Sequence, residues 1–134
     1  MSACVLMIED DREMVMLGKI ILEKEGYTFI SASDGREGLQ LLAENAREID
    51  LILLDIMLPE IYGWEILEKV KSNEKTKHIP VIMLSAKHPL EDEAESSHYA
   101  TLYSAYVVKP FVVRELLDRI AAVLSGSPVD NPAN

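Results

Sequence analysis

Short, largely apolar segments alternate along the chain with longer amphipathic stretches. Segments of a few apolar residues between turn or charged residues are too short for buried helices, and they are typical of strands buried on both faces of a parallel sheet. The segments that predict strands are residues 5–8, 27–32, 51–54, 81–84 and 106–108. We therefore expect a sheet of five mostly buried strands.

Between the strands, apolar residues recur every three or four positions, which is the spacing that buries one face of a helix. For the first, third and fifth helices these positions are Met14, Leu17 and Ile21; Trp64, Leu67 and Val70; and Leu117, Ile120 and Leu124. Asp34 and Glu37 have the spacing of a capping box, so the second helix should begin there and end near Asn45. Residues 91–104 have the acidic start that suits a helix N-terminus, and they predict the fourth helix.

This alternation of strand and helix predicts an α/β fold in which helices cover both faces of a parallel sheet. With 134 residues, the chain suits one doubly wound (βα)5 domain whose core needs no metal or disulfide. We expect residues 1–125 to form this domain. Residues 126–134 are rich in Gly, Pro, Ser and Asn, and predict a flexible C-terminal tail or the start of a linker.

Charge and cysteine content narrow the function classes. The formal net charge of −10 repels a phosphate backbone, so direct nucleic-acid binding by this chain is not expected. Cys4 is the only cysteine, which excludes a disulfide within the chain. No apolar stretch is long enough to cross a membrane, and the N-terminus lacks the basic and hydrophobic regions of a secretory signal. We therefore expect a cytoplasmic protein without a membrane contact.

Polar chemistry is concentrated where the predicted strands stop. Glu9 and Asp10 follow the first strand, Asp55 follows the third, Ser85 follows the fourth and Lys109 follows the fifth. Ligands of open α/β sheets bind outside the carboxyl ends of the strands, so these side chains should share one crevice. Charged residues often follow strands only because loops are solvated. Asp55 is the hardest to explain in that way, because apolar residues flank it on both sides and an unpaired carboxylate would be costly there.

Three carboxylates and one ammonium group in such a crevice suit the acceptance of a phosphoryl group. A carboxylate attacks a phosphodianion poorly because both are negative, and a divalent cation removes this repulsion. We expect Mg²⁺, or Mn²⁺ in its place, to be bound directly by Asp10 and Asp55 and through a water molecule by Glu9. Lys109 should neutralise oxygens of the transferred group, and Ser85 should donate a hydrogen bond to one of them.

These strand ends resemble the receiver domain of two-component response regulators, in order and spacing, over about residues 4–125. The motifs that carry the resemblance are residues 8–11 (Ile-Glu-Asp-Asp), residues 54–59 (Leu-Asp-Ile-Met-Leu-Pro) with Gly63, residues 84–86 (Leu-Ser-Ala) and residues 106–111 (Tyr-Val-Val-Lys-Pro-Phe). The resemblance implies a flavodoxin-like sheet with strand order 2-1-3-4-5. It also implies that Asp55 accepts a phosphoryl group from a sensor histidine kinase or phosphotransfer protein, with the backbone carbonyl of Met57 as a further Mg²⁺ ligand.

The resemblance assigns a switch to Ser85 and Tyr106. In the family the hydroxyl moves toward the phosphoryl group and the aromatic ring turns inward, which alters the surface of the fourth helix, fifth strand and fifth helix for a downstream effector domain or protein. The peptide bond before Pro110 is expected to be cis. Residues 102–105 (Leu-Tyr-Ser-Ala) depart from the Gly-Ala-Asp-Asp of many receivers, so the resemblance leaves a phosphorylation-dependent homodimer open.

Two further positions are expected to set how long the phosphoryl group persists. Met57 lies two residues after Asp55 and Lys87 lies two residues after Ser85, so their side chains should flank a phosphoryl group. Met57 has no polar group that could orient a water molecule, and its apolar chain is expected to obstruct one. We therefore predict slow autodephosphorylation. The alternative is that Met57 contributes only its backbone carbonyl and that its side chain points into solvent.

Other functions on the same topology fit the sequence less well. A receiver that works only as a phosphorylation-independent binding module would not need Asp10, Asp55, Ser85 and Lys109 together. A metal-dependent phosphatase with an aspartyl nucleophile, like the haloacid dehalogenases, needs a second Asp where this chain has Met57. A flavin-binding module would place a phosphate against the acidic residues after the first strand. We expect no enzymatic activity beyond phosphoryl transfer to the domain itself and autodephosphorylation.

Overall fold

A parallel five-stranded sheet forms the centre of the structure, a computed structural model that describes residues 2–87 and 93–126. The strands are β1 (Cys4–Ile8), β2 (Thr28–Ala32), β3 (Leu51–Asp55), β4 (Val81–Ser85) and β5 (Ala105–Val108). The helices are α1 (Arg12–Lys24), α2 (Gly35–Asn45), α3 (Gly63–Ser72), α4 (Glu93–His98) and α5 (Val113–Ser125).

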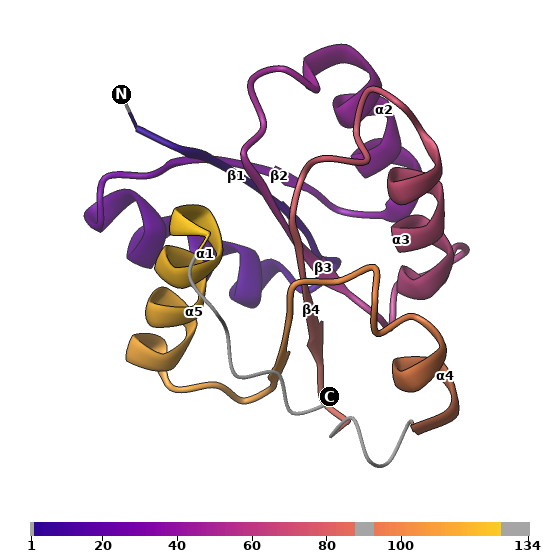
Figure 1. The fold of residues 1–134 in the computed structure, drawn as a ribbon. Coiled ribbons are helices and arrows are strands. Elements are labelled where there is room, and N and C mark those ends of the chain that lie inside the picture. Colours follow the sequence, from indigo (N-terminus) through magenta and orange to yellow (C-terminus); the bar gives the residue numbers. More distant parts are fainter. Residues whose placement is uncertain (1, 88–92, 127–134) are drawn as a thin grey trace.

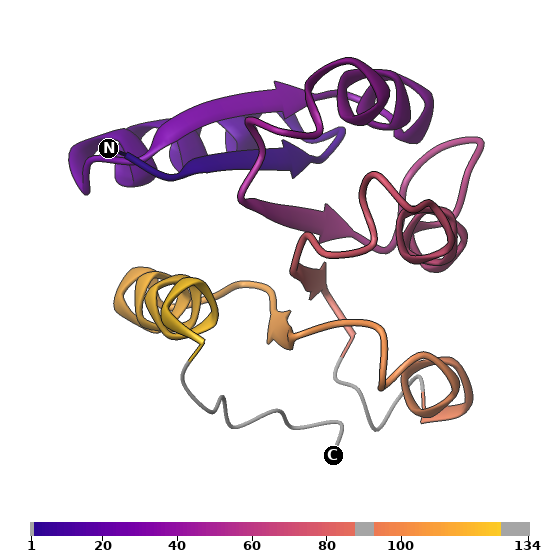
Figure 2. The ribbon, with the colours of Figure 1, turned by 45° about the horizontal axis from the view of Figure 1, so that its top comes forward.

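The sheet has the strand order β2-β1-β3-β4-β5, with every neighbouring pair parallel. Helices α1 and α5 lie on one face of the sheet, and α2, α3 and α4 lie on the other (Figures 1 and 2). This arrangement confirms the predicted α/β class and the flavodoxin-like strand order. The cis peptide bond between Lys109 and Pro110 is confirmed as well.

The sheet separates two apolar cores, because successive strand residues point to opposite faces. In β1, Leu6 and Ile8 belong to the core on the side of α2 and α3, whereas Val5 and Met7 belong to the core on the side of α1 and α5. Every residue of β1, β3 and β4 is buried. Full burial explains why these strands are apolar until their last residues, and why polar groups gather where they end.

Helix α1 packs on the sheet through Met14 and Ile21 as predicted, but not through Leu17. Its buried residues are Gly18 and Leu22, whereas Leu17 is 39% exposed. A Cβ atom at Gly18 would lie 2.9 Å from the sulfur of Met7, so the glycine lets α1 approach β1 closely. The prediction was therefore wrong at Leu17, because a glycine at the contact carries no hydrophobic signal.

Helix α4 is shorter than predicted. The prediction of a helix over residues 91–104 is wrong among the described residues, because α4 ends at His98 and the chain then turns toward β5. Tyr99 and Tyr103 leave the helical path and pack against Trp64 of α3. Residues 91 and 92 lie outside the described part of the chain.

The start of helix α2 has the predicted cap, with one difference. Asp34 Oδ1 accepts a hydrogen bond from the backbone N–H of Glu37 at 2.8 Å. The carboxylate of Glu37 accepts its bond from the N–H of Ser33, at 2.9 Å, and not from the N–H of the capping residue itself. The bond accepted by Asp34 is thus that of the usual capping box, whereas the bond accepted by Glu37 comes from one residue earlier in the chain.

The described part of the chain ends just after helix α5. Gly126, the first residue of the predicted tail, caps α5 in the left-handed conformation with φ of 75°. The remaining residues of the predicted tail, 127–134, lie outside the described part of the chain. Across residues 2–87 and 93–126, no helix combines the length and the apolar character that a membrane span requires.

Candidate functional site

Four strand ends meet at one edge of the sheet and carry the predicted site residues. Asp55 ends β3 and Ser85 ends β4, while Glu9 and Lys109 directly follow β1 and β5. The backbone N–H of Lys109 donates to the carbonyl of Ser85 at 2.7 Å, which continues the pairing of β4 with β5 past the last strand residue. The parallel register thus brings the predicted residues to the same edge, as expected from the sequence.

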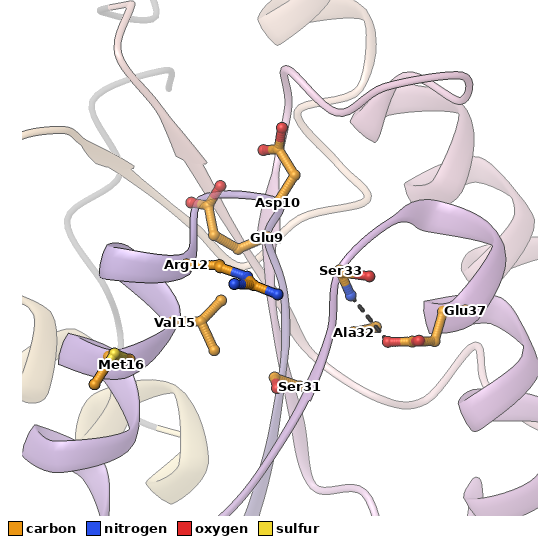
Figure 3. A pocket seen from close by; sticks show the side chains of 9 residues that line it. All are labelled: Glu9, Asp10, Arg12, Val15, Met16, Ser31, Ala32, Ser33 and Glu37. Atoms are coloured by element: carbon orange, nitrogen blue, oxygen red, sulfur yellow. Dashed lines mark hydrogen bonds between the residues drawn. The ribbon is translucent and has the colours of Figure 1, made fainter.

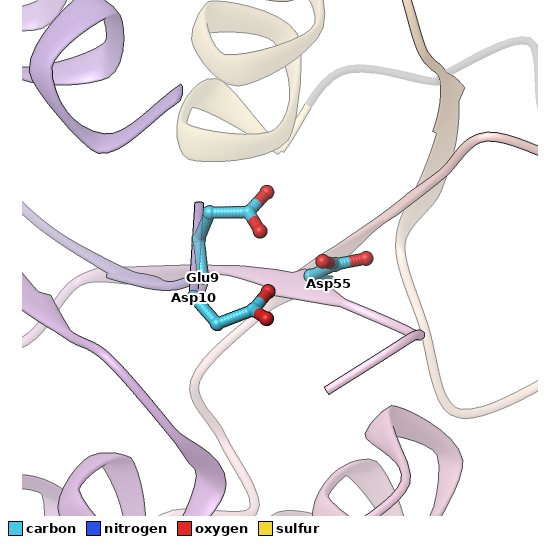
Figure 4. Close-up of side chains that lie close together, drawn as sticks. All are labelled: Glu9, Asp10 and Asp55. Carbon is cyan, nitrogen blue, oxygen red and sulfur yellow. The ribbon is translucent and has the colours of Figure 1, made fainter. Parts of the chain in front are cut away.

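Three carboxylates, Glu9, Asp10 and Asp55, form what we call the acidic trio. Figure 4 shows them projecting from β3 and the end of β1 toward a common space. One oxygen atom of each lies within 4.8 Å of the others. Glu9 is 1% exposed and Asp55 is 4% exposed, whereas Asp10 is exposed. The trio is therefore open to solvent on the side of Asp10.

Glu9 is fully engaged within the protein. Its Oε1 atom lies 2.5 Å from Lys109 Nζ, and its Oε2 atom accepts a hydrogen bond from the backbone N–H of Asp11 at 3.3 Å. Burial and the neighbouring Asp55 carboxyl raise the pKa of Glu9, and the ion pair with Lys109 offsets only part of this effect. The charged form of Glu9 is therefore less favoured than that of an exposed glutamate.

Lys109 joins two members of the acidic trio. Its Nζ atom lies 3.4 Å from Asp55 Oδ2 as well as against Glu9. Burial by itself would lower the pKa of Lys109, but the hydrogen bond to Glu9 and the charge of Asp55 outweigh burial and raise it. Lys109 therefore stays protonated and places a fixed positive charge at the Oδ2 side of Asp55.

The loop after β3 turns tightly beneath Asp55 and fixes its carboxylate. Asp55 Oδ1 accepts a hydrogen bond from the N–H of Met57 at 3.2 Å, and the N–H of Gly63 donates to the carbonyl of Ile56 at 2.9 Å. A Cβ atom at Gly63 would lie 2.4 Å from the Asp55 carbonyl oxygen. This position therefore requires glycine, because backbone cannot move aside as a flexible side chain can.

Ser85 and Tyr106 are connected through the backbone of Lys87. The N–H of Lys87 donates to Ser85 Oγ at 3.0 Å, and the Tyr106 hydroxyl donates to the Lys87 carbonyl at 2.9 Å. Ser85 and Tyr106 are each 1% exposed, so the aromatic ring lies in the inward position. The two residues that the resemblance pairs as a switch are thus two hydrogen bonds apart.

The two positions expected to tune hydrolysis lie in the loops that follow Asp55 and Ser85. Met57 is 50% exposed, and Lys87 is also exposed. Neither side chain is packed into the protein. Their effect on a water molecule near Asp55 stays a prediction.

A cavity of about 390 Å³ opens beside Asp10, between α1 and the end of β2 (Figure 3). It is lined by Glu9, Asp10, Arg12, Val15, Met16, Ser31, Ala32, Ser33 and Glu37. Figure 3 shows the side chain of Arg12 extending into it from the start of α1. No sequence pattern predicts this cavity, because its walls come from separate segments with no common spacing.

The edge of the sheet therefore combines three carboxylates, a fixed ammonium group and a hydroxyl. Residues 5–121 match the family model described as response regulator receiver domain. The chain belongs to this family. It is a receiver domain of the two-component response regulators, and the function class expected from the strand-end residues is confirmed.

Curated relatives of this receiver are longer proteins. Response regulator ArlR of Staphylococcus saprophyticus is 37% identical over 127 residues, which cover 95% of this chain and 54% of ArlR. Transcriptional regulatory protein CpxR of Escherichia coli (strain K12) is 39% identical over 123 residues, which cover 92% of this chain and 50% of CpxR. The chain thus spans about half the length of the curated relatives it matches.

Solved structures match the receiver over nearly their whole length. Chemotaxis protein CheY4 of Vibrio cholerae has a TM-score of 0.82 and 28% identity, with 92% of this chain and 99% of that chain covered. A CheY-like receiver domain protein of Methanospirillum hungatei JF-1 has a TM-score of 0.82 and 33% identity, with 94% and 96% covered. These matches support the fold and the family together.

Proposed function

We propose that this receiver accepts a phosphoryl group on Asp55 from a phosphohistidine of a sensor histidine kinase or phosphotransfer protein. The observation that carries the proposal is the surroundings of Asp55, a buried carboxylate with Lys109 Nζ at 3.4 Å and two further carboxylates close by. Burying two carboxylates, Glu9 and Asp55, beside one ammonium group and a third, exposed carboxylate is costly. The cost is understandable if the cluster exists to hold a cation and a phosphoryl group.

We propose Mg²⁺ as the cation, bound by one oxygen each of Asp10 and Asp55 and by the backbone carbonyl of Met57. The donor set fits, because Mg²⁺ takes oxygen ligands and is typically held by one or two carboxylates together with water. Both oxygens of Glu9 already accept hydrogen bonds within the protein, so Glu9 would contact the ion through water. Mn²⁺ can take the same place. The bound ion would offset the repulsion between the carboxylate and the phosphoryl group.

The side chains of the receiver carry the rest of the transfer. An oxygen of Asp55 forms the new O–P bond while the N–P bond to the partner's imidazole breaks, and the imidazole nitrogen keeps that electron pair. Lys109 stabilises charge on the transferred oxygens as a point charge. Ser85 donates its hydroxyl proton to one of these oxygens in a hydrogen bond.

We further propose that the output is a change in the surface of α4, β5 and α5. A phosphoryl group binds best to the arrangement in which Ser85 and Lys109 contact it, so it shifts the population toward that arrangement. The receiver has about half the length of CpxR, which is named a transcriptional regulatory protein. An effector domain or a separate effector protein would therefore read this surface.

The chemistry is proposed to stay within the receiver and its phosphoryl donor. A phosphatase with an aspartyl nucleophile needs an acid and base two residues after the nucleophile. Met57 holds that position, and its half-exposed thioether cannot exchange a proton. We therefore propose no turnover of an external substrate.

Acetyl phosphate with Mg²⁺ tests the proposal without a partner protein. Intact-mass measurement should show phosphorylation of the wild-type chain and none of Asp55→Asn. Asp118→Asn removes the same charge from an exposed position on α5, and this control should be labelled like the wild type. Full labelling of Asp55→Asn would overturn the assignment. A wild-type chain that takes no phosphoryl group would favour the phosphorylation-independent binding module.

A further inference from the structure

The hydroxyl group of Tyr106 points toward the functional site, and its ring packs in the protein interior. The hydroxyl bonds to the Lys87 carbonyl. The ring lies against two other aromatic rings, with centroid distances of 6.0 Å to Tyr103 and 6.4 Å to Trp64. A movement of the Tyr106 ring would therefore change the surroundings of both.

Trp64 and Tyr103 in turn hold the segment of α4. The Trp64 ring stacks on Tyr99, the residue after α4, with centroids 5.1 Å apart and planes inclined by 8°. Tyr103 is 5% exposed, lies 5.9 Å from Trp64 and donates its hydroxyl to the carbonyl of Ser96 inside α4 at 3.3 Å. Burial raises the pKa of Tyr103 to about 12, so this hydroxyl remains a donor at neutral pH. We call Trp64, Tyr99 and Tyr103 the aromatic bridge.

Helix α4 supplies little apolar surface of its own. It consists of six residues, and a helix of that length is not stable by itself. Its sequence, Glu-Ala-Glu-Ser-Ser-His, offers no large apolar side chain, and Ser96 is its one buried residue. The position of α4 therefore depends on side chains outside it. Among the described residues, those of the aromatic bridge make the aromatic and hydroxyl contacts that serve this purpose.

We propose that the aromatic bridge transmits the position of Tyr106 to α4, holding α4 against α3 when the Tyr106 ring is inward and releasing it when the ring is outward. This inference deepens the proposed function and rests on it, because the phosphoryl group on Asp55 is what biases Tyr106. The connection is continuous from Ser85 through the Lys87 backbone to Tyr106. A phosphoryl oxygen that binds the Ser85 hydroxyl would favour this arrangement, and with it the closed bridge.

Trp64 makes the bridge observable, because it is the single tryptophan of the chain. Phosphorylation of the full chain by acetyl phosphate with Mg²⁺ should shift both the emission of Trp64 and the amide resonances of α4. Tyr103→Phe removes the hydrogen bond to Ser96 and keeps the ring, so the α4 shifts should be reduced. Tyr103→Leu also removes the ring, so these shifts should be lost. In both variants the labelling of Asp55 should remain.

Tyr27→Phe is the matched control, since it removes a tyrosine hydroxyl from a partly buried residue that packs with the other core of the sheet. It should respond like the wild type. A labelled chain whose Trp64 emission does not respond, or whose α4 resonances shift fully in Tyr103→Leu, would overturn the inference alone. Absence of label on Asp55 would overturn the proposed function and the inference with it. If Tyr103→Leu does not fold, Tyr103→Phe decides: undiminished α4 shifts contradict the bridge and reduced shifts support it.

Discussion

The buried charges of the acidic trio lower the stability of the folded protein. Glu9 and Asp55 are both buried, and in the described part of the chain the ammonium group that lies against them is that of Lys109. One cation beside three carboxylates leaves the crevice negative. Such a site lowers the stability of the fold and raises its affinity for a divalent ion. Both effects should be measurable, the first in the pH dependence of stability and the second in metal affinity.

Without Mg²⁺, the contribution of Glu9 to the stability of the receiver should fall as pH rises above the ordinary pKa of this residue, 4.5. The folded state raises this pKa, so the folded protein holds the proton more tightly than the unfolded chain. The resulting stability is fully present below the unfolded pKa and is lost as pH rises through the folded pKa. Urea unfolding at several pH values should show this slope in the wild type and in Glu23→Gln, an exposed control on α1. Glu9→Gln should lack it, and an unchanged slope in Glu9→Gln would contradict the account.

Mg²⁺ affinity should depend more on Asp10 than on Glu9. Asp10→Asn replaces a charged direct ligand with a weaker neutral one. Glu9→Gln alters a residue that holds the site through hydrogen bonds and water, a type of change that typically costs about 10- to 100-fold in affinity. Calorimetric titration with Mg²⁺ gives the order of the two losses. Equal losses, or a larger loss in Glu9→Gln, would mean that the direct and water-mediated contacts are misassigned.

The lifetime of the phosphoryl group should depend on Met57. Met57→Asn supplies a donor and an acceptor that can orient an attacking water, so dephosphorylation in Mg²⁺ should be faster than in the wild type. The decay of labelled protein after removal of acetyl phosphate measures this rate. Met57→Leu is the matched control, because it stays apolar and should decay slowly. Equal decay of Met57→Asn and wild type would indicate that the exposed side chain plays no part.

At the scale of elements, the helices differ in whether a side chain caps their N-terminus. Asp11 accepts a hydrogen bond from the N–H of Glu13 at the start of α1, and Asp34 does the same for α2. Helix α5 has Val112 as its N-cap residue and therefore has no side-chain cap. Since α5 belongs to the proposed output surface, its first turn is held less tightly than those of α1 and α2.

Supplying the missing cap should stabilise the receiver. Val112→Ser places a hydroxyl at an N-cap position with extended backbone, and it should raise the free energy of unfolding by about 1 kcal/mol. Val112 is 65% exposed, so little apolar burial is lost. Val113→Ser, one residue further on, cannot cap and should bring no gain. Urea unfolding compares the two variants, and equal effects would contradict the capping argument.

At the scale of the whole molecule, the sequence predicts the architecture because full burial forces the central strands to be apolar along their length. The same rule locates the site, since Asp55 and Lys109 stand where two such runs end. The length of α4 and the contact at Gly18 were missed, because neither depends on a regular apolar pattern. The aromatic bridge was missed for a related reason: its rings come from α3 and from the segment between α4 and β5, and no spacing connects them.

The central claim is that this fold positions Asp55, and no other carboxylate, to take a phosphoryl group. Borohydride reduction of the protein after treatment with acetyl phosphate and Mg²⁺ tests it most directly, because an acyl phosphate of aspartate is reduced to homoserine, which peptide mass spectrometry locates. The account predicts homoserine at position 55 alone, and none when EDTA is present. Homoserine at position 10, or none at position 55 in Mg²⁺, would contradict it.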